Sequence, residues 1–540
     1  MAALIERLKR ALPGVAASLL LLGSSFQAEG QNPPQEPPPA TTEKQPPAKP
    51  PDDAEKTVRR NVFLYVIDGL GATEVTAYGY PIMTTPNLVS MMEEGITYTN
   101  HYSVSPWTAP AVASLFTALF PSAHGVNRAG ERLPAAARTF AEVLKENGYK
   151  TALFSAHPLV GPLSGLQQGF DWVEEVPGPF YPKASRGPAE SSSVLNARVK
   201  QWLDASGGSA PVFVTVISAD PLQPFGVPDP AGGRFIDAKE LEWYRGIRKR
   251  LLERRPGPLS LATLDDLKYL KADPSRFAAA ARKVYDAAIF HNDAQMRALR
   301  DDLQQRGWLG SSLFVATATH GQELLEHGAF GHGSSLYDVG IKVPLVLTCP
   351  ELFARVNQVR DMADNVDLMP TLLSLLGLPV PEGVQGIVRN LSPAPDKVMP
   401  LQRPAFAEAR PAGELDTGTM VMVAEEGVKF IENSQAPAGL DRSAVELYRR
   451  KEGPQDWDRK NVAGGMPRVM AHEREVLALW KERTNDKRLP ADPGPVPADP
   501  RLKEVLRSLG YLQGSGSAVT PSSAGKQPAG AKAAPSAEHP

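Results

Sequence analysis

Short apolar runs alternate with longer amphipathic stretches from about residue 59 to residue 391, and this alternation restricts the fold more than any other feature. The apolar runs predict strands at 62–67, 151–155, 212–217, 313–318 and 343–347. The stretches with an apolar stripe near the 3.6-residue period predict helices at 85–94, 109–120, 139–147, 194–204, 276–305 and 369–376. Strands and helices that alternate in this way form a mostly parallel sheet sandwiched by helices. The sequence therefore predicts an α/β fold.

The expected domain organisation begins with an N-terminal signal and ends with a polar tail. Residues 1–25 combine basic residues, an apolar run and small residues, as in a secretory signal peptide, and residues 26–58 form a Pro-rich linker. The α/β domain is expected at 59–395, and a small C-terminal α+β subdomain with a terminal helix at 396–513. Residues 514–540 lack apolar periodicity and are expected to be disordered.

The N-terminal pattern indicates an exported protein, periplasmic or secreted. The apolar run is shorter than the ~20 residues that a membrane-spanning helix needs, so an uncleaved anchor is the weaker hypothesis. No later segment qualifies as a span, which argues against an integral membrane protein.

Charge and cysteine content exclude two further classes of protein. Lys and Arg total 58 against 60 Asp and Glu, a net charge of -2, so nucleic acid is not the expected partner. A single cysteine, Cys349, excludes both an internal disulfide framework and a cysteine-based zinc cluster.

Polar residues follow several of the predicted strands. In parallel α/β sheets ligands bind beyond the carboxyl ends of the strands. The residues at these positions are Asp68, His157, Asp220, Thr319 and His320, while Thr108 opens a predicted helix. These side chains are the candidates for a functional site.

Ordered motifs give a more specific indication of the family. They include NVFLYVID at 61–68, TPNL at 85–88, SPWT at 105–108, HG at 320–321, EHG at 326–328, GHG at 331–333 and DLMPTLL at 367–373. In this order they resemble the sulfatases of the alkaline-phosphatase-like superfamily. The segments at 427–431, 446–448 and 506–511 are similar to the small domain that ends those proteins.

The resemblance implies a site that cleaves an anionic ester, either a sulfate or a phosphate ester. One divalent cation, calcium, manganese or zinc, would be held by Asp68, Thr108 and His320, and His327 and His332 would bind substrate. Thr108 stands at the nucleophile position, as in the Thr-nucleophile branches, and its methyl group excludes the formylglycine mechanism of type I sulfatases. Thr108 has a competing interpretation as the N-cap of its helix, with Pro110 in the first turn.

Several positions depart from the family pattern. Thr319 replaces the Asp of the Asp-His-Gly motif and so removes a second anionic metal ligand. Neutral residues also replace titratable ones at Leu222, Val112 and Gln322, and Gly69 replaces the second Asp of many sulfatases. His320 has a competing interpretation as a cap of its loop.

A different metal site is also conceivable in the loop that follows the fourth strand. Its candidate ligands are His320, Glu323, Glu326, His327 and His332. Imidazole and carboxylate together suit zinc. A Gly-rich loop with solvated charges is the competing interpretation.

Two hypotheses about function follow. The favoured one is an exported sulfatase-like protein with a degraded site and no bound metal, which binds an anionic ester or an envelope component. The alternative is a metal-dependent sulfuric or phosphoric ester hydrolase that uses Thr108. Whether the chain is an enzyme is what separates the two.

Overall fold

The first strand, β1 (Val62–Ile67), is buried along its whole length and sends alternate side chains to the two faces of a sheet. Phe63, Tyr65 and Ile67 join one apolar cluster, whereas Val62, Leu64 and Val66 join another. A strand that is covered on both faces has no solvent side, which is why its sequence is continuously apolar.

The central sheet has eight strands in the order β12-β2-β11-β8-β1-β6-β4-β5. The other strands are β2 (Ile96–Tyr98), β4 (Lys150–Ser155), β5 (Trp172–Glu175), β6 (Val212–Ser218), β8 (Leu313–Ala318), β11 (Leu345–Thr348) and β12 (Asn357–Val359). β1 pairs in parallel with β6 and β8, and β4 pairs in parallel with β5 and β6. Only β11 runs against its neighbours. The sheet is therefore mostly parallel, as predicted.

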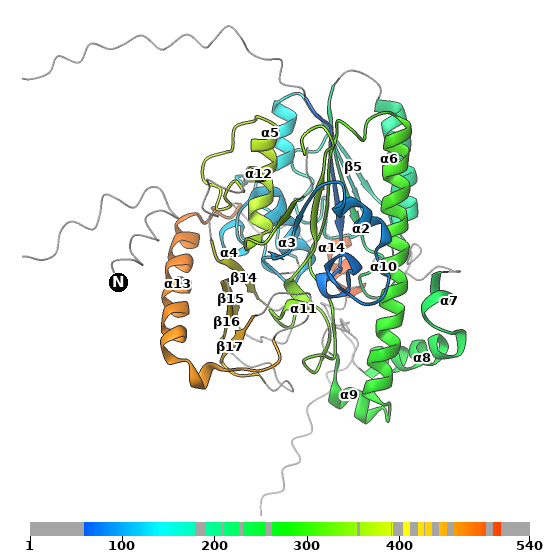
Figure 1. Cartoon of the computed structure of the whole chain (residues 1–540), viewed down its shortest axis with the longest axis vertical. Helices are drawn as coiled ribbons and strands as arrows, with labels where there is room; N and C mark the ends of the chain where they lie inside the picture. The colour runs from blue at the N-terminus through cyan, green and yellow to red at the C-terminus, as the bar shows by residue number, and fades with distance from the viewer. Residues whose placement is uncertain are drawn as a thin grey trace, which may run out of the picture.

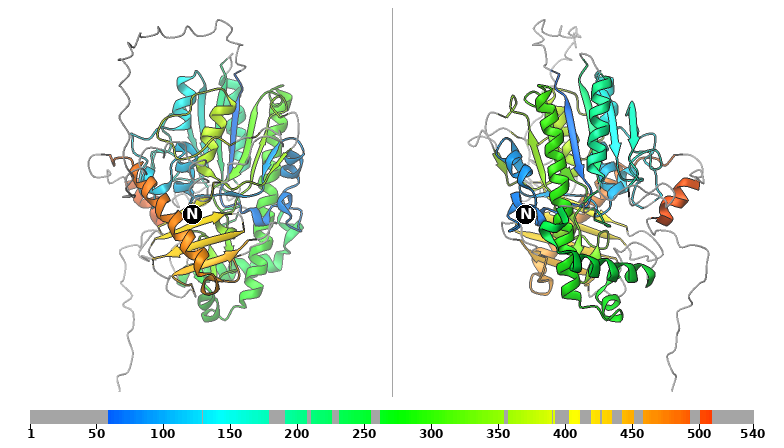
Figure 2. Two further views of the ribbon diagram at one scale, coloured as in Figure 1. Left: turned by 60° about the vertical axis from the view of Figure 1, so that its left-hand side comes forward. Right: turned by 90° about the vertical axis from the view of Figure 1, so that its right-hand side faces the viewer.

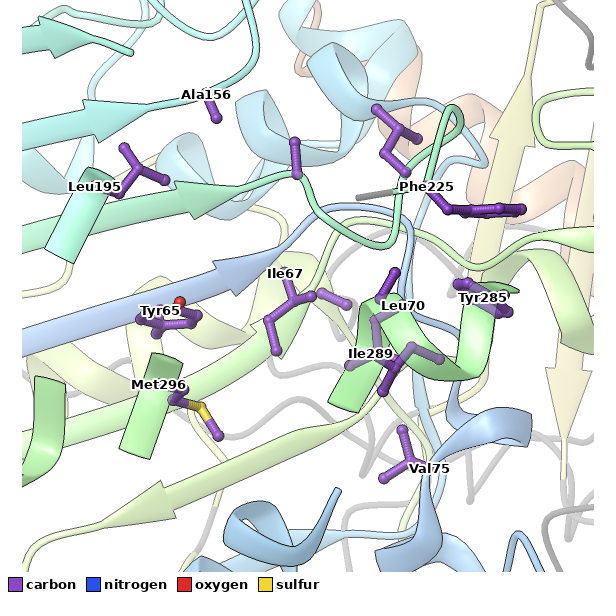
Figure 3. Packing of buried hydrophobic residues seen from close by; sticks show 14 of the residues in the cluster. Tyr65, Ile67, Leu70, Val75, Ala156, Leu195, Phe225, Tyr285, Ile289 and Met296 are labelled. Carbon is purple, nitrogen blue, oxygen red and sulfur yellow. The ribbon is translucent and has the colours of Figure 1, made fainter. Parts of the chain in front are cut away.

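Helices cover both faces of this sheet (Figure 1). One face packs on α2 (Pro86–Met92), α6 (Ser192–Ser206) and α10 (Pro274–Gln305), and α8 (Ala238–Arg254) packs on α10. The other face packs on α3 (Thr108–Thr117), α5 (Phe140–Glu146) and α12 (Leu368–Leu375). Figure 3 shows Tyr65 and Ile67 of β1 lying near Ile289 and Met296 of α10. The predicted α/β fold is confirmed.

A second, antiparallel sheet of four strands lies beside the central one. Its order is β14 (Ala405–Ala409), β15 (Met420–Glu425), β16 (Val428–Asn433) and β17 (Val445–Arg449). One face packs on the helix α13 (Pro467–Asp486) through Leu477 and Trp480. The other face packs on the segment around Leu336 and Ile341 of the larger domain. Figure 2 shows α13 lying across this sheet.

The computed structural model describes residues 59–508, apart from internal segments at 129, 179–190, 207–209, 226–230, 255–261, 354–356, 390, 392–402, 411–418, 426, 435–441, 451–457 and 493–499. The predicted signal, linker and tail, at 1–25, 26–58 and 514–540, lie outside the described residues. Among the described residues, no helix combines the length and apolarity needed to cross a membrane.

A buried lysine ties the small sheet to the larger domain. Lys429 of β16 is fully buried and its Nζ donates to Asp338 (2.8 Å) and to Asp458 (2.6 Å). Asp338 begins the short helix α11 (Asp338–Ile341). Although burial alone would raise it, the charge of Lys429 holds the pKa of Asp338 below its ordinary value. This buried triad therefore depends on the lysine charge.

We expect Lys429→Met to lower the free energy of unfolding by about 3–5 kcal/mol at pH 7, because two buried carboxylates lose their partner. The deficit should shrink as the pH falls below about 4, where these carboxylates become protonated in the unfolded chain. Urea unfolding at several pH values measures both effects. Lys481→Met, which removes an exposed lysine that pairs with Glu432, is the control and should cost at most about 1 kcal/mol.

Candidate active site

The adjacent ends of β1 and β8 bring the predicted site residues together. Ile67 lies opposite Ala318 in the parallel register, so the residues that follow, Asp68 and Thr319, are neighbours at one edge of the sheet. His320 comes next along the chain, and Thr108 approaches from the start of α3. All four side chains are at least nine-tenths buried.

The Asp68 carboxylate is the centre of this group. It accepts a short hydrogen bond from Thr319 Oγ1 and one from Thr108 Oγ1, which lies 3.0 and 3.1 Å from the two carboxylate oxygens. His320 Nε2 lies 3.4 Å from Oδ1 of Asp68 and 3.3 Å from Thr108 Oγ1. Thr319 Oγ1 in turn accepts from the backbone N–H of Gly69. The carboxylate is thus enclosed by groups of the chain itself.

Thr108 is not the N-cap of its helix. Trp107 occupies the cap position with an extended backbone, and Thr108 is the first helical residue. The Thr108 hydroxyl is directed to Asp68 and His320 instead of to the free N–H groups of the first turn. The cap interpretation of Thr108 is therefore wrong, and the residue faces the strand ends.

Three imidazoles line the group. The His320 ring stacks on His332 with centroids 4.4 Å apart, and His332 meets the edge of Trp107 at 5.3 Å. His320 Nδ1 lies 2.9 Å from the Gly321 carbonyl oxygen, so Nδ1 carries the proton and Nε2 presents a lone pair to Asp68 and Thr108. His157 follows β4, and its Nδ1 accepts from the Leu159 backbone N–H.

Burial disfavours the charged forms of these groups. Desolvation raises the pKa of Asp68 from 3.8 to about 7, and the hydrogen bonds from Thr319 and Thr108 only partly oppose this rise. Burial lowers the pKa of His320 to about 4 and that of His157 to about 3, and it also lowers the pKa of His332 well below its ordinary value. At neutral pH the group holds no cationic imidazole, and its carboxyl is close to its titration midpoint.

The residues that depart from the family pattern pack against one another. Gly69 has φ +83°, and a Cβ added there would lie 2.9 Å from Gln322 Nε2 and 3.0 Å from the Leu222 Cα. A second aspartate after Asp68 therefore has neither the backbone conformation nor the space. Val112 lies on the inner face of α3, within the apolar cluster of the sheet. Leu222 and Gln322 thus occupy the space beside Gly69.

The donor set does not fit a hard dication. A calcium or manganese ion needs several anionic oxygens. The group offers one carboxylate, two hydroxyls and three imidazoles, and the carboxylate already accepts bonds from both hydroxyls. The strand ends thus present few anionic oxygens to a hard dication.

The other predicted site residues lie apart from this group. The His327 ring packs on Tyr337, with centroids 3.9 Å apart. Glu326 pairs with Arg282, and Glu323 accepts from Ser335. Within the described residues, the five candidates of the alternative zinc site form no ligand cluster.

Asp220 has a structural role. Its carboxylate accepts from the backbone N–H groups of Ser191 and Ser192, at the start of α6, and from Asn292 Nδ2 of α10. His157, by contrast, belongs to the site although no motif marked it. The only signal in the sequence was its place directly after a strand.

Comparisons with known proteins agree with the fold and the motifs. The sulfatase family model matches residues 60–378. The chain is 23% identical over 353 residues to arylsulfatase K of Bos taurus, covering 60% of this chain and 64% of that protein. It is 21% identical over 409 residues to N-acetylglucosamine-6-O-sulfatase of Bacteroides thetaiotaomicron, covering 62% of this chain and 70% of that protein. The match to arylsulfatase K thus spans less than two thirds of that relative.

Solved structures share the architecture. The phosphonate monoester hydrolase of Agrobacterium radiobacter superimposes with a TM-score of 0.62 at 21% identity, covering 79% of this chain and 96% of that one. A protein solved in complex with its substrate D-glucosamine-2-N,6-O-disulfate gives a TM-score of 0.59 at 17% identity, covering 79% and 98%. At these identities the likeness establishes the fold alone.

The raised pKa of Asp68 predicts how stability depends on pH. Because the folded state holds this proton more tightly than the unfolded chain, the favourable contribution is complete below about pH 4 and is lost as the pH rises through 7. We expect Asp68→Asn, which mimics the protonated form, to exceed the wild type in unfolding free energy by a few kcal/mol at pH 8, an order-of-magnitude figure. The advantage should vanish towards pH 4.

Denaturant unfolding across pH 4–8 makes this comparison. The control is Asp301→Asn, an exposed position on α10, which should show no such trend. A wild type that is more stable than Asp68→Asn at pH 8 would contradict the prediction, because it would mean that the ionised carboxylate is stabilised.

Proposed function

The chain belongs to the sulfatase family, and from this membership and the geometry of the strand ends we propose that it is a member that does not hydrolyse esters through a bound metal ion. Sulfatases usually bind a divalent metal. Here the observation that carries the proposal is the enclosed Asp68 carboxylate, which accepts from Thr319 and Thr108 and faces His320. Without a metal to lower its pKa, the Thr108 hydroxyl is a poor nucleophile at neutral pH.

Thr319 is the residue on which this proposal depends most. Its hydroxyl donates to Asp68 and accepts from Gly69, and so it joins the ends of β1 and β8 by neutral hydrogen bonds. An aspartate at the same place would present a second anion to Asp68. Two carboxylates this close repel each other unless a cation lies between them. The threonine therefore stabilises the ends of these strands without a metal.

We further propose that the protein recognises an anionic ester, such as a sulfated sugar, through uncharged groups. The support is the family relationship to N-acetylglucosamine-6-O-sulfatase, together with the neutral imidazoles beside Thr108. Gln322 adds an amide nitrogen that is buried and has no hydrogen-bond partner among the described residues. His332 is the partly exposed member of the group and forms its accessible edge.

We also propose that the protein is exported. This part of the proposal rests on the N-terminal sequence pattern.

Thr319→Asp tests the metal part of the proposal. Without metal, the variant should be less stable than the wild type because of carboxylate repulsion. Calcium or manganese should then raise the Tm of the variant by several degrees and bind at least about tenfold more tightly than to the wild type. Thermal unfolding and calorimetric titration measure the two effects.

Thr319→Val is the matched control for this experiment. It removes the same hydroxyl without adding charge, so it should cost about 1 kcal/mol and show no response to metal. A wild type that already binds calcium or manganese stoichiometrically, with loss of binding in both Asp68→Asn and Thr319→Asp, would overturn the proposal and favour the metal-dependent hydrolase that uses Thr108.

Binding of N-acetylglucosamine 6-O-sulfate tests the recognition part. We expect tighter binding than for unsulfated N-acetylglucosamine, with no release of sulfate and little dependence on salt, because the donors carry no charge. His332→Phe keeps a stacking ring but removes its N–H, and it should weaken binding about fivefold, the equivalent of one neutral hydrogen bond.

Calorimetry, together with a sulfate-release assay, distinguishes the outcomes. Equal affinity for the sulfated and unsulfated sugars would contradict recognition of the ester while leaving the loss of metal chemistry standing. Release of sulfate that is lost in Thr108→Ala would contradict both parts.

A further inference from the structure

Three potential metal ligands meet between α13 and the small antiparallel sheet, away from the strand-end site. Glu425 ends β15, and His472 and Glu473 lie in the second turn of α13. Each offers one ligand atom, and these atoms lie within 4.8 Å of one another. His472 Nε2 is 3.5 Å from Glu425 Oε2. Figure 1 and Figure 2 show α13 packed along this sheet.

Glu473 is the unusual member of this group. It is only 1% exposed, and its Oε2 has no hydrogen-bond partner among the described residues. It shares the apolar stripe of α13 with Leu477 and Trp480, four and seven residues further on, which pack on the sheet. A buried carboxyl without a partner carries a free-energy cost that an ordinary helix stripe would avoid with an apolar residue.

The surroundings of Glu473 favour a cation. Two basic residues of α13, Arg474 and Lys481, pair with Glu432 instead of with Glu473. A cation placed between the two carboxylates would relieve their repulsion and supply the missing partner of Glu473 Oε2.

We propose that Glu425, His472 and Glu473 bind a divalent transition metal ion of the zinc class. An imidazole and two carboxylates are ligands that such an ion accepts, and water would complete the coordination. Glu425 and His472 are each about a third exposed, so the ion can enter from solvent. The bound metal joins the end of β15 to α13 and thereby fastens the helix to the sheet.

This site is independent of the proposed function. It uses no residue of the strand-end group, and its three ligands come from β15 and α13. Stoichiometric zinc at α13 is compatible both with an inactive and with an active strand-end site.

The test is calorimetric titration of the full chain with zinc chloride at pH 7.5, alongside Tm measurements with and without zinc. We expect one zinc ion per chain and a Tm that rises with zinc. Glu473→Gln, which preserves shape and neutralises the buried carboxyl, should weaken zinc binding at least about tenfold and abolish the shift in Tm. Glu475→Gln, which changes an exposed glutamate on the same helix, should bind as the wild type does.

His472→Ala provides a second variant at a partly exposed position, in case the buried substitution affects folding. It too should lose the tight zinc site. Asp68→Asn should retain it, which separates this site from the strand ends. Zinc binding that is unchanged in Glu473→Gln and His472→Ala, or zinc binding that is lost in Asp68→Asn, would overturn the proposal.

Discussion

The hydrogen bond between Thr319 and Asp68 is the interaction on which the candidate site depends. It joins the ends of β1 and β8, the two strands at the centre of the main sheet, and it fixes the carboxylate that Thr108 and His320 also face. A hydroxyl at this place satisfies the carboxylate without introducing charge. An anionic side chain there would require a cation to be stable in so buried a position. Thr319 therefore joins the two strand ends without adding a charge to them.

The neighbouring substitutions are consistent with the closed arrangement. Gly69 adopts a left-handed conformation in which any side chain would press on Leu222 and Gln322. Tyr285 of α10 holds the same turn, since its hydroxyl donates to the Gly69 carbonyl and accepts from the Gly71 N–H. Figure 3 shows Tyr285 facing Phe225, which follows Leu222 closely in the chain. Gly69, Leu222 and Gln322 therefore fit together around one turn.

The sequence predicted the bounds of strands best where burial on both faces of the sheet required every residue to be apolar. β1 and β8 coincide with the predicted runs at 62–67 and 313–318, because a strand buried on both faces must be apolar throughout. α8 was missed, since only Tyr244, Ile247 and Leu251 of its 17 residues are buried and charged residues mask that stripe. β2 was missed because three residues carry no usable periodicity.

The positions of Asp68, Thr319 and His320 directly after predicted strands correctly indicated that the three lie side by side, because adjacent parallel strands end at one edge of the sheet. What the sequence could not give was the direction of each side chain. Thr108 suits a cap by residue type, yet its hydroxyl points to Asp68. His327 lies five residues from His332 but packs on Tyr337, whereas the distant His157 joins the group. Such choices depend on tertiary packing that spacing does not encode.

Buried charged side chains lie at the contact between the small sheet and the larger domain. Lys429 lies between Asp338 and Asp458, while Arg442 donates to the Ser334 carbonyl and approaches Glu323. Ser334 and Glu323 belong to the loop that carries His332. Arg442, in the segment before β17, thus contacts the segment whose His332 stacks on His320. The C-terminal part of the chain therefore borders the segment that carries His332, although none of its described residues belongs to the site itself.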